Sequence, residues 1–64
     1  MKLDRDKIDI AMSKKRRTVA QLAKEYGVSR SRMNIILNSQ TVTPATVGRL
    51  SDVLGVTVEE IIMS

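Results

Sequence analysis

The chain has 64 residues, a net charge of +4, a single aromatic side chain and neither cysteine nor histidine. Disulfides, thiolate or imidazole metal sites and enzymes built on Cys or His are therefore excluded, and the lack of cysteine fits a reduced, cytoplasmic setting. A chain this short is expected to form one domain, residues 1–64, and no stretch reaches the roughly 18 apolar residues of a membrane span.

Positive charge is concentrated in the first half of the chain. Residues 1–32 carry ten Lys or Arg and four acidic residues, a net charge of +6, whereas residues 33–64 carry one and three, a net charge of −2. Such a basic half indicates an anionic partner, and nucleic acid is the commonest one for a small basic domain. A solvated basic face without a partner is the alternative.

The first predicted helix covers residues 4–15. Asp4 is a residue type that accepts hydrogen bonds from the free amides of a first helical turn. Ile8, Ala11 and Met12 then recur at helical spacing, which predicts a buried stripe.

The second and third predicted helices, 18–26 and 29–38, are joined by a very short turn. Thr18 and Gln21 form a capping box at the start of the second helix, and Gly27 can adopt the left-handed conformation that ends it. A turn this short makes the two helices cross steeply.

Small residues at Ala23 and Gly27 are expected to permit the close approach of these helices. The helix after the turn is then held rigidly, and its exposed side can enter a DNA major groove about 12 Å wide.

The last two predicted helices cover 43–54 and 57–62. Thr43 and Thr57 are their capping residues, and Gly55 ends the first of the pair. With no usable strand, the predicted fold class is all-α, with five helices in one compact unit.

Three side chains on the exposed side of the predicted helix 29–38 can read base edges: Arg30, Ser31 and Asn34. Arginine pairs with guanine O6 and N7, and asparagine pairs with adenine N6 and N7. Cations in a first turn oppose the helix dipole, so Arg30 and Arg32 indicate a role beyond stability, with Arg32 on phosphate. Ordinary solvated charge is the alternative.

The ordered set of these features resembles the helix-turn-helix domain of the phage lambda repressor and Cro proteins, the Cro/C1 or Xre type. The resemblance covers Ile8 to Ile62. Its carriers are Thr18-Val19-Ala20-Gln21-Leu22-Ala23, Gly27-Val28-Ser29, Met33 with Ile36, Pro44, and Leu50 through Leu54-Gly55-Val56-Thr57-Val58 to Ile61. The resemblance implies a five-helix domain that binds operator DNA as a dimer, with the third helix in the major groove. No cofactor, small-molecule ligand or membrane is expected.

The resemblance also implies phosphate contacts on both sides of the reading helix. On the matching positions these contacts are Thr18 and Val19 at the second helix, and Asn38, Gln40, Thr41 and Thr43 after the third.

The sequence departs from the family pattern at three places. Many members have Gln at the position of Val19, so phosphate contact there is left to backbone amides. An Arg–Glu pair between the first and third helices is replaced by Met12 and Leu37, which predicts an apolar contact.

The third departure is the run Lys14-Lys15-Arg16-Arg17, where relatives have Gly followed by an apolar residue. The run is either a helix C-terminus favoured by cations or an extra clamp on the DNA backbone, and the two interpretations are compatible.

A dimer is expected, at least on DNA, because one module of this kind buries only ~600–1,000 Å². The C-terminal segment has more apolar side chains than a short helix needs. Val58, Ile62 and Met63 are therefore predicted to lie in a two-fold interface, the alternative being that they close the core.

The predicted function is a sequence-specific regulator of transcription that binds double-stranded DNA, a phage or mobile-element repressor or Cro-like protein acting on a pseudo-palindromic operator. The alternative is an antitoxin or another protein-interaction module that retains the fold. An enzyme is not expected, because the sequence has no nucleophile with a base, no carboxylate pair in an apolar setting and no glycine-rich phosphate loop.

Overall fold

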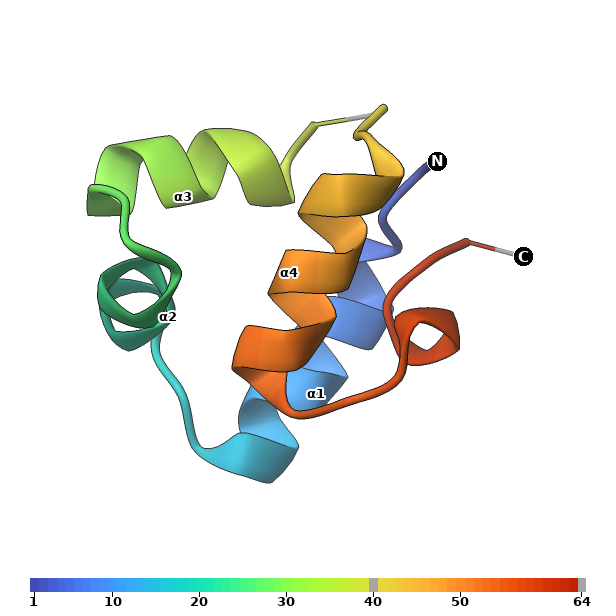
Figure 1. The fold of residues 1–64 in the computed structure, drawn as a ribbon. Helices are drawn as coiled ribbons and strands as arrows, with labels where there is room; N and C mark the ends of the chain where they lie inside the picture. Colours follow the sequence, from blue (N-terminus) through green and yellow to red (C-terminus); the bar gives the residue numbers. More distant parts are fainter. Residues whose placement is uncertain (40, 64) are drawn as a thin grey trace.

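The computed structural model describes residues 1–39 and 41–63. Four α-helices are followed by one short 3₁₀ helix (Figure 1): α1 (Arg5–Lys15), α2 (Val19–Tyr26), α3 (Arg30–Leu37), α4 (Pro44–Leu54) and η1 (Val58–Glu60). The predicted all-α class is confirmed.

Each α-helix begins where its capping residue predicts. The side chains of Asp4, Ser29 and Thr43 accept hydrogen bonds from backbone amides three residues further on, at 3.1, 3.1 and 3.3 Å. Thr18 and Gln21 form the reciprocal capping box, at 3.2 and 2.9 Å. These bonds satisfy first-turn amides that have no partner within a helix.

The prediction of a fifth helix over 57–62 is wrong, because only the three residues of η1 are helical. The backbone that would continue the helix pairs with the start of the chain instead. The Ile61 carbonyl accepts from the Asp4 amide at 2.9 Å, and the Met63 amide donates to the Lys2 carbonyl at 3.0 Å. The β-branched residues of this segment suit such an extended pairing better than a helix.

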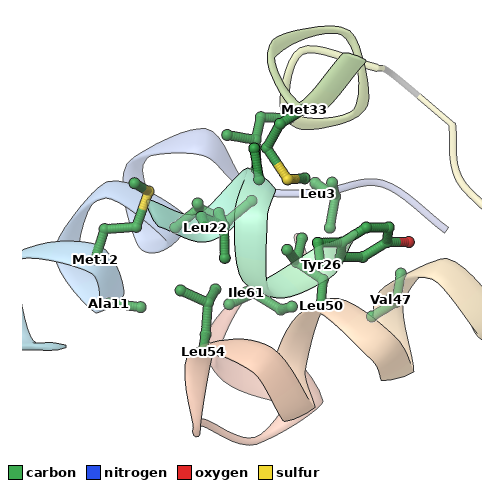
Figure 2. Packing of buried hydrophobic residues seen from close by; sticks show 13 residues of the cluster. Leu3, Ala11, Met12, Leu22, Tyr26, Met33, Val47, Leu50, Leu54 and Ile61 are labelled. Carbon is green, nitrogen blue, oxygen red and sulfur yellow. The ribbon is translucent and has the colours of Figure 1, made fainter. Parts of the chain in front are cut away.

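The core lies between α4 and the other helices (Figure 2). Its members are Leu3, Ile8, Ala11, Met12, Leu22, Ala23, Tyr26, Met33, Leu37, Val47, Leu50, Leu54 and Ile61. Met12 and Leu37 are both buried in this cluster, which fits the apolar replacement that the sequence predicts.

The first residues of the chain also hold the loop between α3 and α4. The Val42 amide donates to the Met1 carbonyl at 2.8 Å, and the backbone nitrogen of Met1 donates to the Val42 carbonyl at 3.0 Å. The N-terminal segment therefore joins this loop to the end of the chain. None of the described helices combines the length and apolar character needed to cross a bilayer.

Candidate nucleic-acid interface

The α2–turn–α3 unit is built around the carbonyl of Ala23. This oxygen accepts from the amides of Gly27 and Val28, at 2.8 and 3.0 Å, which closes the end of α2. Ala23 itself is buried, and α3 packs mainly against α2. Ser29 then starts α3, so the direction of α3 is fixed within three residues of the end of α2.

Gly27 is needed for its backbone conformation, not for space. Its φ is +93°, in the left-handed region that favours glycine. A Cβ at this position would lie 3.5 Å from Nη2 of Arg49, which is an ordinary contact. The expectation that bulk at Gly27 would force the helices apart is therefore not supported, whereas the burial of Ala23 supports it there.

Arg49 of α4 secures the same turn, a role that the sequence did not reveal. Its Nη2 donates to the Tyr26 carbonyl at 2.6 Å, and its guanidinium carbon lies 4.5 Å from the centre of the Tyr26 ring. A cation at the last carbonyl of a helix is favourable, and stacking on an aromatic ring adds to it. The side chain of Arg49 thus connects α4 to the end of α2.

The two sides of α3 differ sharply. Met33 and Leu37 are buried against α2 and the core, whereas Arg30 and Ser31 are exposed. Asn34 is half-buried at the edge between the two sides. Two of the three predicted base-reading side chains are therefore exposed, and the third is half-buried beside them.

Ile35 is a candidate contact that the sequence analysis missed. It lies four residues after Ser31 on the outward side of α3, and 58% of it is exposed. The signal was its helical phase, because Met33 and Leu37 define a buried stripe on which Ile35 does not fall. An exposed isoleucine here can contact the 5-methyl group of thymine.

The amino end of α3 is strongly positive. Arg30 and Arg32 are exposed, and the first turn has no acidic residue to offset them. Within the described part of the chain the ion pairs are Arg5–Asp9 and Arg17–Glu25, so neither arginine of α3 belongs to one. Two cations at the positive end of a helix dipole produce a field that attracts phosphate.

The amino end of α2 provides backbone donors. Thr18 is exposed and Val19 is half-buried. The capping box uses the amides of Thr18 and Gln21, so the amides of Val19 and Ala20 are the first-turn donors left without a partner in an isolated helix.

The other predicted phosphate contacts follow α3. Asn38, Thr41 and Thr43 are exposed there, although the Thr43 hydroxyl also caps α4. Gln40 lies outside the described residues. Asn38, Thr41 and Thr43 are thus exposed polar residues that follow α3.

Two basic side chains missed by the sequence analysis lie beside Asn38. Nη1 of Arg5 donates to Oδ1 of Asn38 at 3.3 Å. Lys2 and Arg5 line an open cavity of about 350 Å³ together with Asn38. The N-terminal segment thus brings positive charge to a loop that has no charged residue over 38–43.

Most of the basic run between α1 and α2 lies against other parts of the protein. Nη1 of Arg17 lies 2.6 and 2.7 Å from the carboxylate oxygens of Glu25, and 3.4 Å from the Val53 carbonyl. Lys15 lies beside Gly55 at the end of α4, since a Cβ on that glycine would be 3.8 Å from its Nζ.

The two remaining cations of the run also differ in surroundings. Lys14 lines a groove beside η1, and Arg16 is exposed at the end of α1 with a positive φ of 54°. Lys14, Lys15 and Arg17 thus lie beside residues at or just after the end of α4, and Arg16 alone has no such neighbour among the described contacts.

The three residues predicted to lie in a two-fold interface also differ in their surroundings. Val58 and Ile62 are half-buried and pack against the core, and Ile62 pairs with Leu3 in an isolated bridge. Met63 is 55% exposed. The packing of Val58 and Ile62 fits the alternative of core closure, and the interface itself stays a prediction.

The chain matches the model of one protein family, described as the Cro/C1-type HTH DNA-binding domain, over residues 7–63. No match to the chain is found among curated proteins or among solved structures. The match covers most of the chain, and it spans the capped α2–turn–α3 unit, the exposed side of α3 and the polar loop that follows. The chain belongs to the family of Cro/C1-type helix-turn-helix DNA-binding domains.

Proposed function

We propose that this protein is a sequence-specific regulator of transcription that places α3 in the major groove of operator DNA. The observation that carries the proposal is the outward side of α3. Arg30, Ser31 and Ile35 are exposed there on a helix whose opposite side is buried, and whose start is fixed by the turn at Gly27.

Each side chain of this surface has a distinct expected partner. Arg30 can donate two hydrogen bonds to guanine, and Asn34 can pair with adenine. Ser31 can donate to or accept from several bases, while Ile35 contacts a thymine methyl. A site read by these four residues contains both G·C and A·T pairs.

Phosphate contacts would position α3 from both sides. On one side are Thr18 and the free amides of Val19 and Ala20; Arg32 adds a charge at the amino end of α3. On the other are Asn38, Thr41 and Thr43, with Lys2 and Arg5 supplying charge. Of the basic run, Arg16 is the member best placed to add a contact, since Lys14, Lys15 and Arg17 have neighbours within the protein.

The protein would act by occupying DNA, with no chemical step. One copy reads one half of a pseudo-palindromic operator, and two copies together bury enough surface for useful specificity. A repressor or Cro-like role in a phage or mobile element is the form of regulation that we favour.

The test is selection of bound duplexes from a random DNA pool, followed by binding measurements on the enriched sequence. We expect a palindrome, and we expect Arg30→Ala to relax the preference at one base position in each half. Lys24→Ala is the matched control, because Lys24 is an exposed cation of α2. Enrichment of no sequence, or equal effects of both variants on every duplex, would contradict the proposal.

A further inference from the structure

A groove lies on the side of the molecule away from α2 and α3. It runs along α1 beside η1 and has a volume of about 320 Å³. Its lining residues are Lys7, Ile10, Ala11, Lys14, Val56, Glu59 and Glu60. In Figure 1 the segment that follows α4 lies on the far side of α4 from α2 and α3.

The floor of this groove is apolar. Ala11 is buried and Val56 is half-buried, but Ile10 is 56% exposed although it lies in the middle of α1. A large apolar side chain exposed beside a groove is typical of a protein contact.

The rims of the groove carry opposite charges. Lys7 and Lys14 of α1 form one rim, and Glu59 and Glu60 of η1 form the other. Across the described chain no ion pair joins the two rims. Lys7 Nζ donates to the Ile62 carbonyl at 3.0 Å, and the Glu60 carboxylate accepts from the Thr57 amide at 2.9 Å, so Lys14 and Glu59 are the rim charges most available to a partner. The acidic rim would repel DNA, so the groove suits a protein that presents both signs of charge.

We infer that a second copy of this chain docks on the groove, with Ile10 at the centre of a two-fold interface. This inference rests on the proposed function, because it locates the dimer that an operator with two half-sites requires. A two-fold axis along the groove places the basic rim of each copy opposite the acidic rim of the other. An axis across the groove would instead oppose like charges.

The same axis keeps both reading helices at one end of the dimer. The groove follows α1 over two turns, from Lys7 to Lys14, so an axis along it is parallel to α1. The end of α3 lies at the start of α1, where Arg5 donates to Asn38. Rotation about this axis preserves the height of each residue along it, so the ends of the two α3 helices lie at the same height in the dimer.

The area of the surface along the groove predicts that two copies associate weakly. One copy exposes 4157 Å², so a standard interface of ~800 Å² per partner would need about a fifth of its surface. A face along two helical turns is smaller than this. Two copies are therefore expected to associate mainly when neighbouring half-sites hold them together.

Single-cysteine crosslinking tests the position of the interface. The natural chain has no cysteine, so Ile10→Cys and Met63→Cys each create a single thiol. With a short thiol-specific crosslinker, on a selected two-half-site duplex and without DNA, we expect a covalent dimer from Ile10→Cys and several-fold less from Met63→Cys. The reverse ranking, or no dimer from Ile10→Cys in either condition, would overturn the inference.

Reversing the charge of rim residues tests whether the basic rim of one copy pairs with the acidic rim of the other. Lys14→Glu and Glu59→Lys should each weaken binding of the second copy by about two- to fivefold, and the double variant should restore it. Ile10→Glu should weaken it by more than about tenfold. Lys24→Glu is the control for charge alone, and failure of the double variant to recover would refute the pairing.

A duplex with one half-site scrambled separates this inference from the proposed function. If Ile10→Glu binds that duplex as the natural chain does but loses the second copy on the full duplex, both stand. If the natural chain binds the single half-site but no copy pairs through Ile10, the interface is refuted and the DNA-binding function remains.

Discussion

Arg16 is held in a backbone conformation that glycine adopts more easily. Among the described residues it is the single non-glycine with a positive φ, at φ 54° and ψ 44°. The conformation ends α1, because the amide of Arg16 donates to the Ser13 carbonyl at 3.2 Å and that of Arg17 to the Met12 carbonyl at 2.9 Å. A side chain in this region costs about 1–2 kcal/mol.

Replacing Arg16 with glycine should therefore stabilise the fold. The relief of about 1–2 kcal/mol is partly offset by the greater freedom of glycine in the unfolded chain, about 0.5–1 kcal/mol. A net gain of about 0.5–1 kcal/mol raises the melting temperature of a domain this size by roughly 2–8 °C. DNA affinity should fall at the same time, with a salt slope smaller by about one, if Arg16 contacts phosphate.

Thermal unfolding followed by circular dichroism measures the first effect, and binding at several salt concentrations measures the second. Arg17→Gly is the matched control. It should lower the melting temperature, because Arg17 has a negative φ and pairs with Glu25. A lower melting temperature for Arg16→Gly would refute the reasoning about backbone strain.

Three further predictions concern α3 and its turn. Arg30→Ala should cost ~1–3 kcal/mol on the selected operator and less on other duplexes, measured by fluorescence anisotropy; a uniform loss would place Arg30 on phosphate. Ile35→Ala should cost about 1 kcal/mol, and the variant should no longer distinguish thymine from uracil in the duplex, whereas continued discrimination would exclude the methyl contact. Gly27→Ala should destabilise the free protein by about 1–2 kcal/mol in urea unfolding, because its φ is +93°; an unchanged midpoint would show that the turn tolerates a Cβ.

The helix starts could be predicted from the sequence because their causes are local. A cap such as Ser29 or Thr43 bonds an amide three residues away, so the pattern and the interaction lie in the same short segment. The ends at Gly27 and Gly55 are equally local, since both residues have a positive φ. The fold class and the position of α3 follow from these local features.

The failed fifth helix has a cause that no local pattern contains. Its sequence includes a capping box, and the Glu60 carboxylate does accept from the Thr57 amide at 2.9 Å. The helix stops because Ile61 and Met63 bond to residues near the start of the chain, about sixty positions away. Pairing between distant segments overrides a local start signal.

The candidate site also contains residues that the sequence could reveal and one that it could not. Arg30 and Ser31 could be assigned from helical phase alone, and the same phase would have identified Ile35. Arg49 could not be found in this way, because its role depends on where α4 crosses the end of α2.

The distribution of basic residues limits how many of them can contact DNA phosphates at once. The ten basic residues of the first half do not form one surface, because Arg17 faces Glu25, Lys15 lies beside Gly55, and Lys7 and Lys14 line the groove along α1. Of the six that remain, Lys24 lies within α2, and the other five are Lys2, Arg5, Arg16, Arg30 and Arg32. Arg5 is also paired with Asp9, so five is an upper limit. For one copy on one half-site, five cations give a slope of log affinity against log salt no steeper than about −4.5, whereas ten would give about −9. A half-site slope near −9 would mean that the basic run does clamp the backbone, and that the ion pair of Arg17 opens on DNA.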